Sequence, residues 1–262
     1  DTASMRPWYA VIWVLGTACG RYGFDASDGF DASDSSDSVT AVYAVAVLAD
    51  RPIAYFRFNE TTGTVARSVV GSVQGTYEGT FGFGAAGAVG DGDPSITFDG
   101  STTRIVVGDV FRFANRAPYS FEVWIKPAEL GSTRFIVDRR TSTGNREGYT
   151  MYVGETYFLF SRTTNGSEFG YVSADPPALD VWTHAVVTFD GSKQAMYVDS
   201  VLVQVNLGDA ANPIGDAVGA FTIGDLSPGQ FFKFKGQMDE LAVYDRALAP
   251  ETVKAHFDAA RR

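Results

Sequence analysis

Short runs in which apolar and polar residues alternate recur along most of the chain, and this period of two is typical of β-strands with one buried face. The clearest run is 119–126 (YSFEVWIK), where Tyr119, Phe121, Val123 and Ile125 form one apolar face. Similar runs predict strands at 53–58, 95–98, 103–107, 134–138, 149–153, 157–161, 169–172, 220–224, 231–234 and 237–244. The pattern therefore predicts a domain rich in β-structure.

Residues 182–203 (WTHAVVTFDGSKQAMYVDSVLV) predict three short strands joined by two tight turns. The first turn contains Asp190-Gly191, and glycine tolerates the positive φ that two-residue hairpin turns require. The second turn contains Asp199-Ser200. Both faces of the first strand carry bulky residues, so we expect this strand to be covered on both sides.

The predicted strands follow one another without interleaved helical patterns, which favours an all-β antiparallel sandwich over an α/β fold. The predicted helix covers 250–260, where Pro250 stands in the first turn. A net charge of −10 argues against nucleic acid as a partner, because nucleic-acid binding requires a basic surface. The single cysteine, Cys19, excludes an internal disulfide.

Residues 1–19 have the composition of an export signal. Arg6 provides a positive charge before the apolar stretch 8–15, which is too short to span a bilayer. The sequence LGTAC at 15–19 resembles the lipobox of bacterial lipoprotein signals, which implies that Cys19 is lipidated and that the membrane is contacted through this lipid anchor only. The alternative is an ordinary secretory signal with an incidental cysteine. In both cases we expect an exported protein, which belongs to the bacterial cell envelope or surface if it is lipid-anchored and is otherwise secreted.

Residues 20–39 form an acidic segment in which Phe-Asp-Ala-Ser-Asp occurs twice, at 24–28 and 30–34. Such a segment cannot bury enough apolar surface to offset the entropy of ordering it, so we expect a disordered tether. The alternative is a calcium-binding aspartate repeat, although the spacing lacks the glycine and the terminal glutamate of an EF-hand loop.

Five segments occur in the order and spacing of one known family: 54–60 (AYFRFNE), 98–100 (FDG), 119–127 (YSFEVWIKP), the hairpins of 182–203, and 236–248 (GQMDELAVYDRAL). Together they resemble laminin-G-like domains of the concanavalin A-like lectin and glucanase group. The resemblance implies one antiparallel jelly-roll β-sandwich over residues 40–262, with a short C-terminal helix.

Glycosidases of this fold place two carboxylates on one strand, in a pattern like E-x-D-x-x-E, and the chain lacks such a pattern. Asp239 and Glu240 are adjacent, so on a regular strand they point to opposite faces and cannot act together. Glu122 stands alone on its strand. We expect His184 to pack in the core and His256 to be exposed on the terminal helix. Catalysis is therefore not predicted.

Domains that this chain resembles often hold a structural Ca²⁺ with carboxylate and backbone oxygens. The resemblance points to Asp239, with Asn59 as a companion ligand. The alternative is that Asp239 accepts backbone hydrogen bonds or caps a turn.

Aromatic and basic side chains expected on exposed loops are the candidates for ligand binding, because aromatic rings stack on sugars and arginines pair with acidic groups. They are Arg139, Arg140, Arg146, Tyr149 and Tyr157, with Phe169 nearby. For any one of them the alternative is strand packing. The segment 139–146 (RRTSTGNR) is a basic loop on an acidic protein and is the best candidate to contact an anionic partner.

The sequence thus predicts an exported, lipid-anchored, non-catalytic module that recognises an extracellular glycan or protein at the cell surface. Two alternatives remain open: a glycan-acting hydrolase of the concanavalin A-like fold, and a structural protein of surface assembly.

Overall fold

The computed structural model describes residues 42–131, 133–141, 146–208, 212–216, 218–226 and 232–262. All of them belong to one compact unit, Ser36–Arg262. The predicted signal segment 1–19, the tether 20–39 and Cys19 lie outside the described residues, so they remain predictions. No helix among the described residues is long and apolar enough to cross a membrane.

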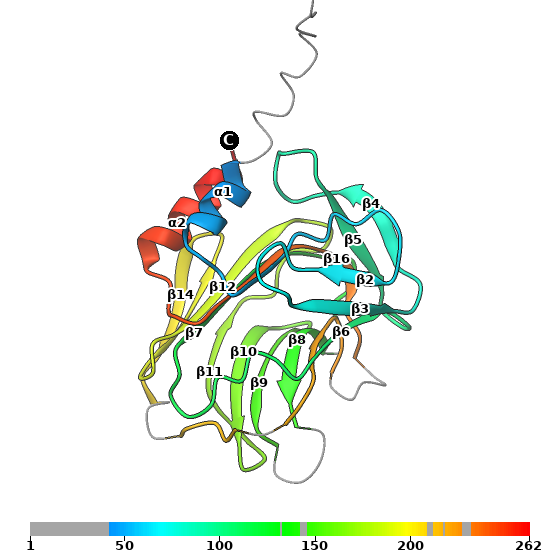
Figure 1. The fold of residues 1–262 in the computed structure, drawn as a ribbon. Helices are drawn as coiled ribbons and strands as arrows, with labels where there is room; N and C mark the ends of the chain where they lie inside the picture. Colours follow the sequence, from blue (N-terminus) through cyan, green and yellow to red (C-terminus); the bar gives the residue numbers. More distant parts are fainter. Residues whose placement is uncertain (1–41, 132, 142–145, 209–211, 217, 227–231) are drawn as a thin grey trace, which may run out of the picture. The chain divides into compact units, whose positions relative to one another are not determined.

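Two antiparallel sheets, each of eight strands within the described ranges, form the fold (Figure 1). The first sheet has the order β14 (Val201–Asn206), β13 (Gln194–Val198), β12 (Thr183–Phe189), β7 (Tyr119–Pro127), β16 (Lys235–Tyr244), β5 (Pro94–Asp99) and β4 (Gly82–Ala86), with β1 (Ala54–Phe56) pairing to β16. The second sheet has the order β11 (Ser167–Ala174), β10 (Phe158–Thr164), β9 (Gly148–Val153), β8 (Arg134–Arg140), β15 (Phe221–Ile223), β6 (Arg104–Gly108), β3 (Gln74–Glu78) and β2 (Val65–Arg67). The prediction of an all-β sandwich is confirmed.

The main core lies between the two sheets. The predicted apolar face of β7 is fully buried there, and Phe121 packs against Tyr149 and Phe160 of the second sheet, with ring centroids 5.0 and 5.9 Å apart. Aromatic rings dominate this core because each one buries a large apolar area.

A second, smaller core lies on the outer face of the first sheet, beneath helices α1 (Val42–Ala49) and α2 (Pro250–Ala259). The two helices lie side by side in Figure 1. Tyr43 and Val47 of α1 and Val253 of α2 pack there with Trp124 and Tyr244 of the sheet. The prediction of α2 is confirmed. Helix α1 was not predicted, because its sequence VYAVAVLA is apolar on almost all sides and shows no clear helical period.

The β13–β14 turn keeps the geometry of a tight hairpin although it lacks glycine. Asp199 has φ 48° and Ser200 has φ 68°, so both central residues adopt the left-handed conformation of a type I′ turn. Asp199 compensates part of the strain by accepting a hydrogen bond from the His184 amide, at 2.9 Å.

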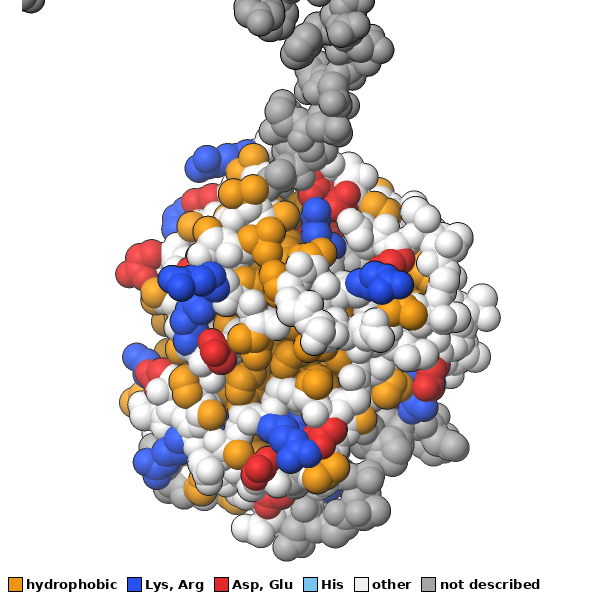
Figure 2. Space-filling view, viewed as in Figure 1, with side chains coloured by type: hydrophobic (Ala, Val, Ile, Leu, Met, Phe, Trp, Pro, Cys, Tyr) orange, Lys and Arg blue, Asp and Glu red, His pale blue; other side chains and the backbone are white. Residues whose placement is uncertain are grey.

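Charged side chains of both signs are interspersed on the face seen in Figure 2, where hydrophobic side chains gather near the middle. The surface of this acidic protein is therefore mixed in charge on that face.

Candidate ligand groove and acidic cluster

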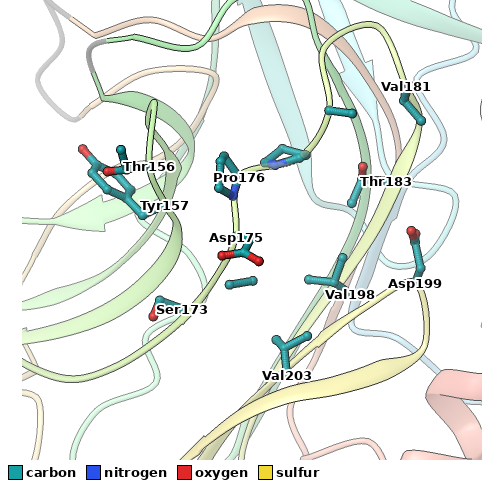
Figure 3. A pocket seen from close by; sticks show the side chains of 13 residues that line it. Thr156, Tyr157, Ser173, Asp175, Pro176, Val181, Thr183, Val198, Asp199 and Val203 are labelled. Atoms are coloured by element: carbon teal, nitrogen blue, oxygen red, sulfur yellow. The ribbon is translucent and has the colours of Figure 1, made fainter.

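A groove of about 670 Å³ opens at the edge of the sandwich, where the β9–β10 turn and the end of β11 face β12, β13 and β14 (Figure 3). Its walls are formed by Thr156, Tyr157, Ser173, Ala174, Asp175, Pro176, Pro177, Ala178, Val181, Thr183, Val198, Asp199 and Val203. The volume lies within the range of about 300–1,000 Å³ that is usual for small-ligand sites. We call this feature the edge groove.

Tyr157 forms one wall of the edge groove and is held in place by its surroundings. A Cβ at Gly154 would lie 2.4 Å from Cζ of Tyr157, so the ring packs directly on the glycine. The Tyr157 hydroxyl forms a 2.8 Å hydrogen bond with Thr133, and the ring meets Tyr152 edge to face at 5.7 Å. A half-buried aromatic ring fixed in this way offers a ready surface for stacking.

Carboxylates and hydroxyls supply the polar part of the edge groove. Asp175 is exposed directly after β11, and Asp199 is exposed in the β13–β14 turn. Ser173 and Thr156 add hydroxyls. Figure 3 places Tyr157 on one side, Asp199 on the other, and Asp175 between them. The arrangement can accept hydrogen bonds from a ligand that also stacks on an aromatic ring.

A second polar feature, the acidic cluster, consists of Asp91, Asp93, Asp239 and Glu240 around Arg57. Carboxylate oxygens of Asp91, Asp93 and Glu240 lie within 4.8 Å of one another. Nη2 of Arg57 donates to Asp91 at 2.6 Å and to Glu240 at 3.0 Å, and it also pairs with Asp93. The Arg57 guanidinium thus forms ion pairs with three carboxylates.

The prediction that Asp239 and Glu240 point to opposite faces is wrong. Glu240 has φ 53°, and the pairing of β16 with β7 shifts register between Asp239 and Ala242. This β-bulge breaks the alternation of side chains. Asp239 lies opposite Trp124 on the outer face of the sheet, and Glu240 contacts Tyr55 on the same face. Both carboxylates therefore enter the acidic cluster.

Burial perturbs these two carboxyl groups strongly. It raises the pKa of Asp239 well above its usual range, and the nearby Glu240 charge adds to this effect. Burial likewise raises the pKa of Glu240 to about 7, although the Arg57 guanidinium opposes the shift. Oδ2 of Asp239 accepts a hydrogen bond from the Ala88 amide at 2.8 Å, whereas its buried Oδ1 has no partner among the described residues.

These observations fit a hard cation such as Ca²⁺, which prefers carboxylate and carbonyl oxygens. Three carboxylates pair with a single guanidinium, and Asp239, which interacts electrostatically with this cluster, has one buried carboxylate oxygen without a partner among the described residues. Asn59 is exposed and joins the rim of the acidic cluster through Asp93, to which its amide donates at 3.4 Å. The predicted ligands Asp239 and Asn59 thus lie at one feature, and their role in metal binding remains a prediction.

A third group of polar residues, the Glu122 network, is sealed beneath the two helices. Glu122 is 0 % exposed and accepts hydrogen bonds from Tyr43 and Tyr244, each at 3.0 Å. Nε2 of His184 lies 2.8 Å from the same carboxylate, and Nδ1 of His256 lies 2.9 Å from it. This enclosure gives Glu122 a structural role, because a substrate cannot reach it from solvent.

The expectation that His256 is exposed on the terminal helix is wrong, because α2 turns it toward the sheet and leaves it 1 % exposed. Glu122 is the only carboxylate of β7, as the sequence predicts, but side chains of other elements surround it. Burial disfavours the charge of Glu122, but His256 and His184 outweigh it and hold the Glu122 pKa below its ordinary value. Burial acts to lower the pKa of His256, yet Glu122 and Asp50 raise it. The predicted burial of His184 is confirmed.

The laminin-G-like sequence profile of the concanavalin A-like lectin/glucanases superfamily matches residues 98–254. The chain belongs to this superfamily. A search of curated proteins finds no match.

Several solved structures share the fold of this chain. Domain 4 of AbnA, a GH43 extracellular arabinanase from Geobacillus stearothermophilus, solved with arabinotriose, is 18% identical over 80% of this chain and 98% of its own, with a TM-score of 0.60. The binding domain of paraclostridial mosquitocidal protein 1 is 13% identical (80% and 52% covered, TM-score 0.63). The botulinum neurotoxin serotype D ligand binding domain, solved with N-acetylneuraminic acid, is 10% identical (81% and 52% covered, TM-score 0.64). The chain spans about half the length of the two toxin domains.

Within this lectin/glucanase fold, the expectation that Arg139, Arg140 and Tyr149 are exposed on loops is wrong. Strands β8 and β9 carry them into buried positions. Arg139 pairs with Asp109 at 2.9 Å. Arg140 pairs with Asp138 and Glu168, at 2.7 and 3.1 Å, and the Tyr149 hydroxyl donates to the Phe111 carbonyl at 2.9 Å. These side chains are engaged inside the lectin/glucanase domain.

Of the predicted ligand-binding residues, Tyr157 lines the edge groove, Arg146 is exposed next to the undescribed residues 142–145, and Phe169 is half-buried on β11. Sequence reasoning missed Asp175 and Asp199. The Asp-Pro-Pro sequence that begins at Asp175 marks the end of a strand and could have indicated a loop of this kind.

Proposed function

We propose that this lectin/glucanase-fold chain is a non-catalytic carbohydrate-binding module and that the glycan binds in the edge groove. The observation that carries the proposal is the fixed Tyr157 ring facing the carboxylates of Asp175 and Asp199 across a groove of about 670 Å³. Sugars present an apolar ring face and a rim of hydroxyls, and this pairing of an aromatic surface with hydrogen-bond acceptors suits them.

The comparisons support this choice. The matching domains include one solved with arabinotriose and one solved with N-acetylneuraminic acid, and another is named a binding domain. A fold does not identify a ligand, so the assignment rests on the edge groove of this chain.

The proposal includes export and attachment to the cell surface through lipidated Cys19, which would present the module to extracellular glycans. It also includes a structural Ca²⁺ held at the acidic cluster, with Asp239 as a ligand and Asn59 at the rim. The ion would neutralise carboxylates that Arg57 balances only in part. Its role would be to stabilise the loop around Asp91 rather than to bind sugar.

A glycan array probed with the full chain tests the proposal. We expect saturable binding without release of sugar, and at least about a fivefold loss of affinity in Tyr157→Ala, because stacking on one aromatic ring contributes on the order of 1 kcal/mol or more. Tyr171→Ala is the matched control, since Tyr171 is 54 % exposed on β11 and does not line the edge groove.

Binding that survives Tyr157→Ala would contradict the assignment to the edge groove. Release of sugar would favour the hydrolase alternative, and the absence of binding to any glycan would favour surface assembly or a protein partner.

A further inference from the structure

We infer that the edge groove selects non-anionic oligosaccharides and rejects acidic ones. This inference rests on the proposed function and adds the charge class of the ligand. It also differs from the expectation drawn from residues 139–146, which pointed to an anionic partner.

The charged residues of the edge groove all have one sign. Asp175 and Asp199 line it, and no Lys, Arg or His is among the described residues that form its walls. Oδ1 of Asp199 accepts a hydrogen bond from the His184 amide at 2.9 Å, and this bond holds the carboxylate at the rim of the groove. An acidic sugar in the groove would therefore meet two carboxylates with no lining cation to pair with.

The basic side chains that sequence reasoning assigned to an anionic ligand are occupied elsewhere. Arg139 and Arg140 are almost fully buried, and each forms an ion pair with a neighbouring acidic residue. Neither lines the edge groove. Moving the Arg140 guanidinium to a ligand would break its ion pair with the buried carboxylate of Asp138, which is costly.

A neutral sugar, in contrast, matches each part of the groove. A carboxylate oxygen such as those of Asp175 accepts hydrogen bonds from sugar hydroxyls, and such charge-assisted bonds are stronger than neutral ones. The hydroxyls of Thr156 and Ser173 can donate or accept. Pro176 and Val203 add apolar surface to the groove, and the volume accommodates a short oligosaccharide.

The test compares matched oligosaccharides of one backbone: a neutral form, its uronate analogue and its amino-sugar analogue. The full chain is immobilised and dissociation constants are measured by biolayer interferometry. We expect the uronate form to bind at least about tenfold more weakly than the neutral form, because like charges are brought together. The amino-sugar form should bind at least as tightly as the neutral form.

Two variants assign the effect to the edge groove. Asp175→Asn keeps the shape of the side chain and removes its charge. The ratio of the dissociation constants of the uronate and neutral forms should therefore decrease by several-fold. Asp245→Asn is the matched control, because Asp245 is exposed outside the edge groove and the variant has the same net charge. The ratio should stay unchanged in this control.

The outcomes separate the two proposals. A uronate form that binds as tightly as the neutral form, with binding lost in Tyr157→Ala, would overturn the charge inference and retain the groove as a glycan site. The charge inference would also be overturned if the ratio of the uronate and neutral dissociation constants were the same in Asp175→Asn and in the Asp245→Asn control. Absence of binding to all three forms, or binding that survives Tyr157→Ala, would overturn the proposed function and this inference with it.

Discussion

The Glu122 network should make the stability of the domain depend on pH, and Glu122→Gln tests this directly. The variant keeps the shape of the side chain but removes the charge that faces His256 at 2.9 Å and His184 at 2.8 Å. Neutralising one partner of a buried ion pair costs about 3–5 kcal/mol. Because glutamine retains one oxygen acceptor, we expect the free energy of unfolding to decrease by an amount near the lower limit of this range, about 3 kcal/mol.

The sign of the pH dependence follows from the two pKa shifts. The pKa of His256 is raised by Glu122, so its contribution is complete below its ordinary value of 6.5 and is lost as pH rises through the raised pKa. The pKa of Glu122 is lowered, so its contribution is present above its ordinary value of 4.5 and is lost on acidification. The network therefore stabilises the fold most between about pH 4.5 and 6.5. Glu122→Gln should therefore lower the free energy of unfolding by more at pH 5.5 than at pH 9.

Urea unfolding at these two pH values, followed by tryptophan fluorescence, provides the measurement. The ring of Trp124 lies 4.8 Å from that of His184, so its emission reports on the network. In thermal unfolding the same loss corresponds to a decrease of about 6–12 °C for a domain of this size. Glu155→Gln, at an exposed position, is the control and should change stability by less than about 0.5 kcal/mol. A cost below about 1 kcal/mol at pH 5.5, or an equal cost at both pH values, would refute the reasoning.

Three further predictions concern other parts of the chain. Replacing EDTA by millimolar Ca²⁺ should raise the melting temperature by several degrees, and Asp239→Asn should remove most of this rise; a melting temperature that ignores Ca²⁺ would contradict the metal site. Cys19→Ser should abolish acyl labelling and release the protein from the membrane fraction, whereas retention there would count against lipidation. Ser200→Gly should stabilise the fold by roughly 0.5 kcal/mol, because it relieves a left-handed residue at φ 68°; a loss of stability would show that the Ser200 side chain contributes contacts of its own.

The fold was accessible from the sequence because its strands are long and strongly patterned. The alternation in β7 places four residues in the core, and the structure buries all four. Helix α1 escaped prediction because its residues are apolar on almost every side, so only the packing of Tyr43 and Val47 on the sheet distinguishes a helix there from a strand.

The sites were less predictable because they depend on contacts between distant segments. The alternation rule fails at Glu240, where the register shift against β7 turns two adjacent carboxylates to one face. The basic residues of 139–146 appeared available for ligands. In the structure, Arg139 forms an ion pair with Asp109 and Arg140 with Glu168, and the sequence does not mark these acidic residues as neighbours. Tyr157 could be identified because it stands beside a turn at a strand end.

Helix α1 has a mechanical consequence for the domain. Any tension that reaches it through the chain preceding Val42 enters at α1, which is tied to Glu122 of β7 by Tyr43 near its start and to His256 of α2 by Asp50 just after its end. Both ties lead to the Glu122 network, since Asp50 binds His256 at 3.2 Å. Beyond them the load would pass to β1, which is hydrogen-bonded to β16 in the interior of the first sheet. The buried carboxylate would thus act as the first anchorage against pulling, and its strength under load would follow the acidity of the surroundings.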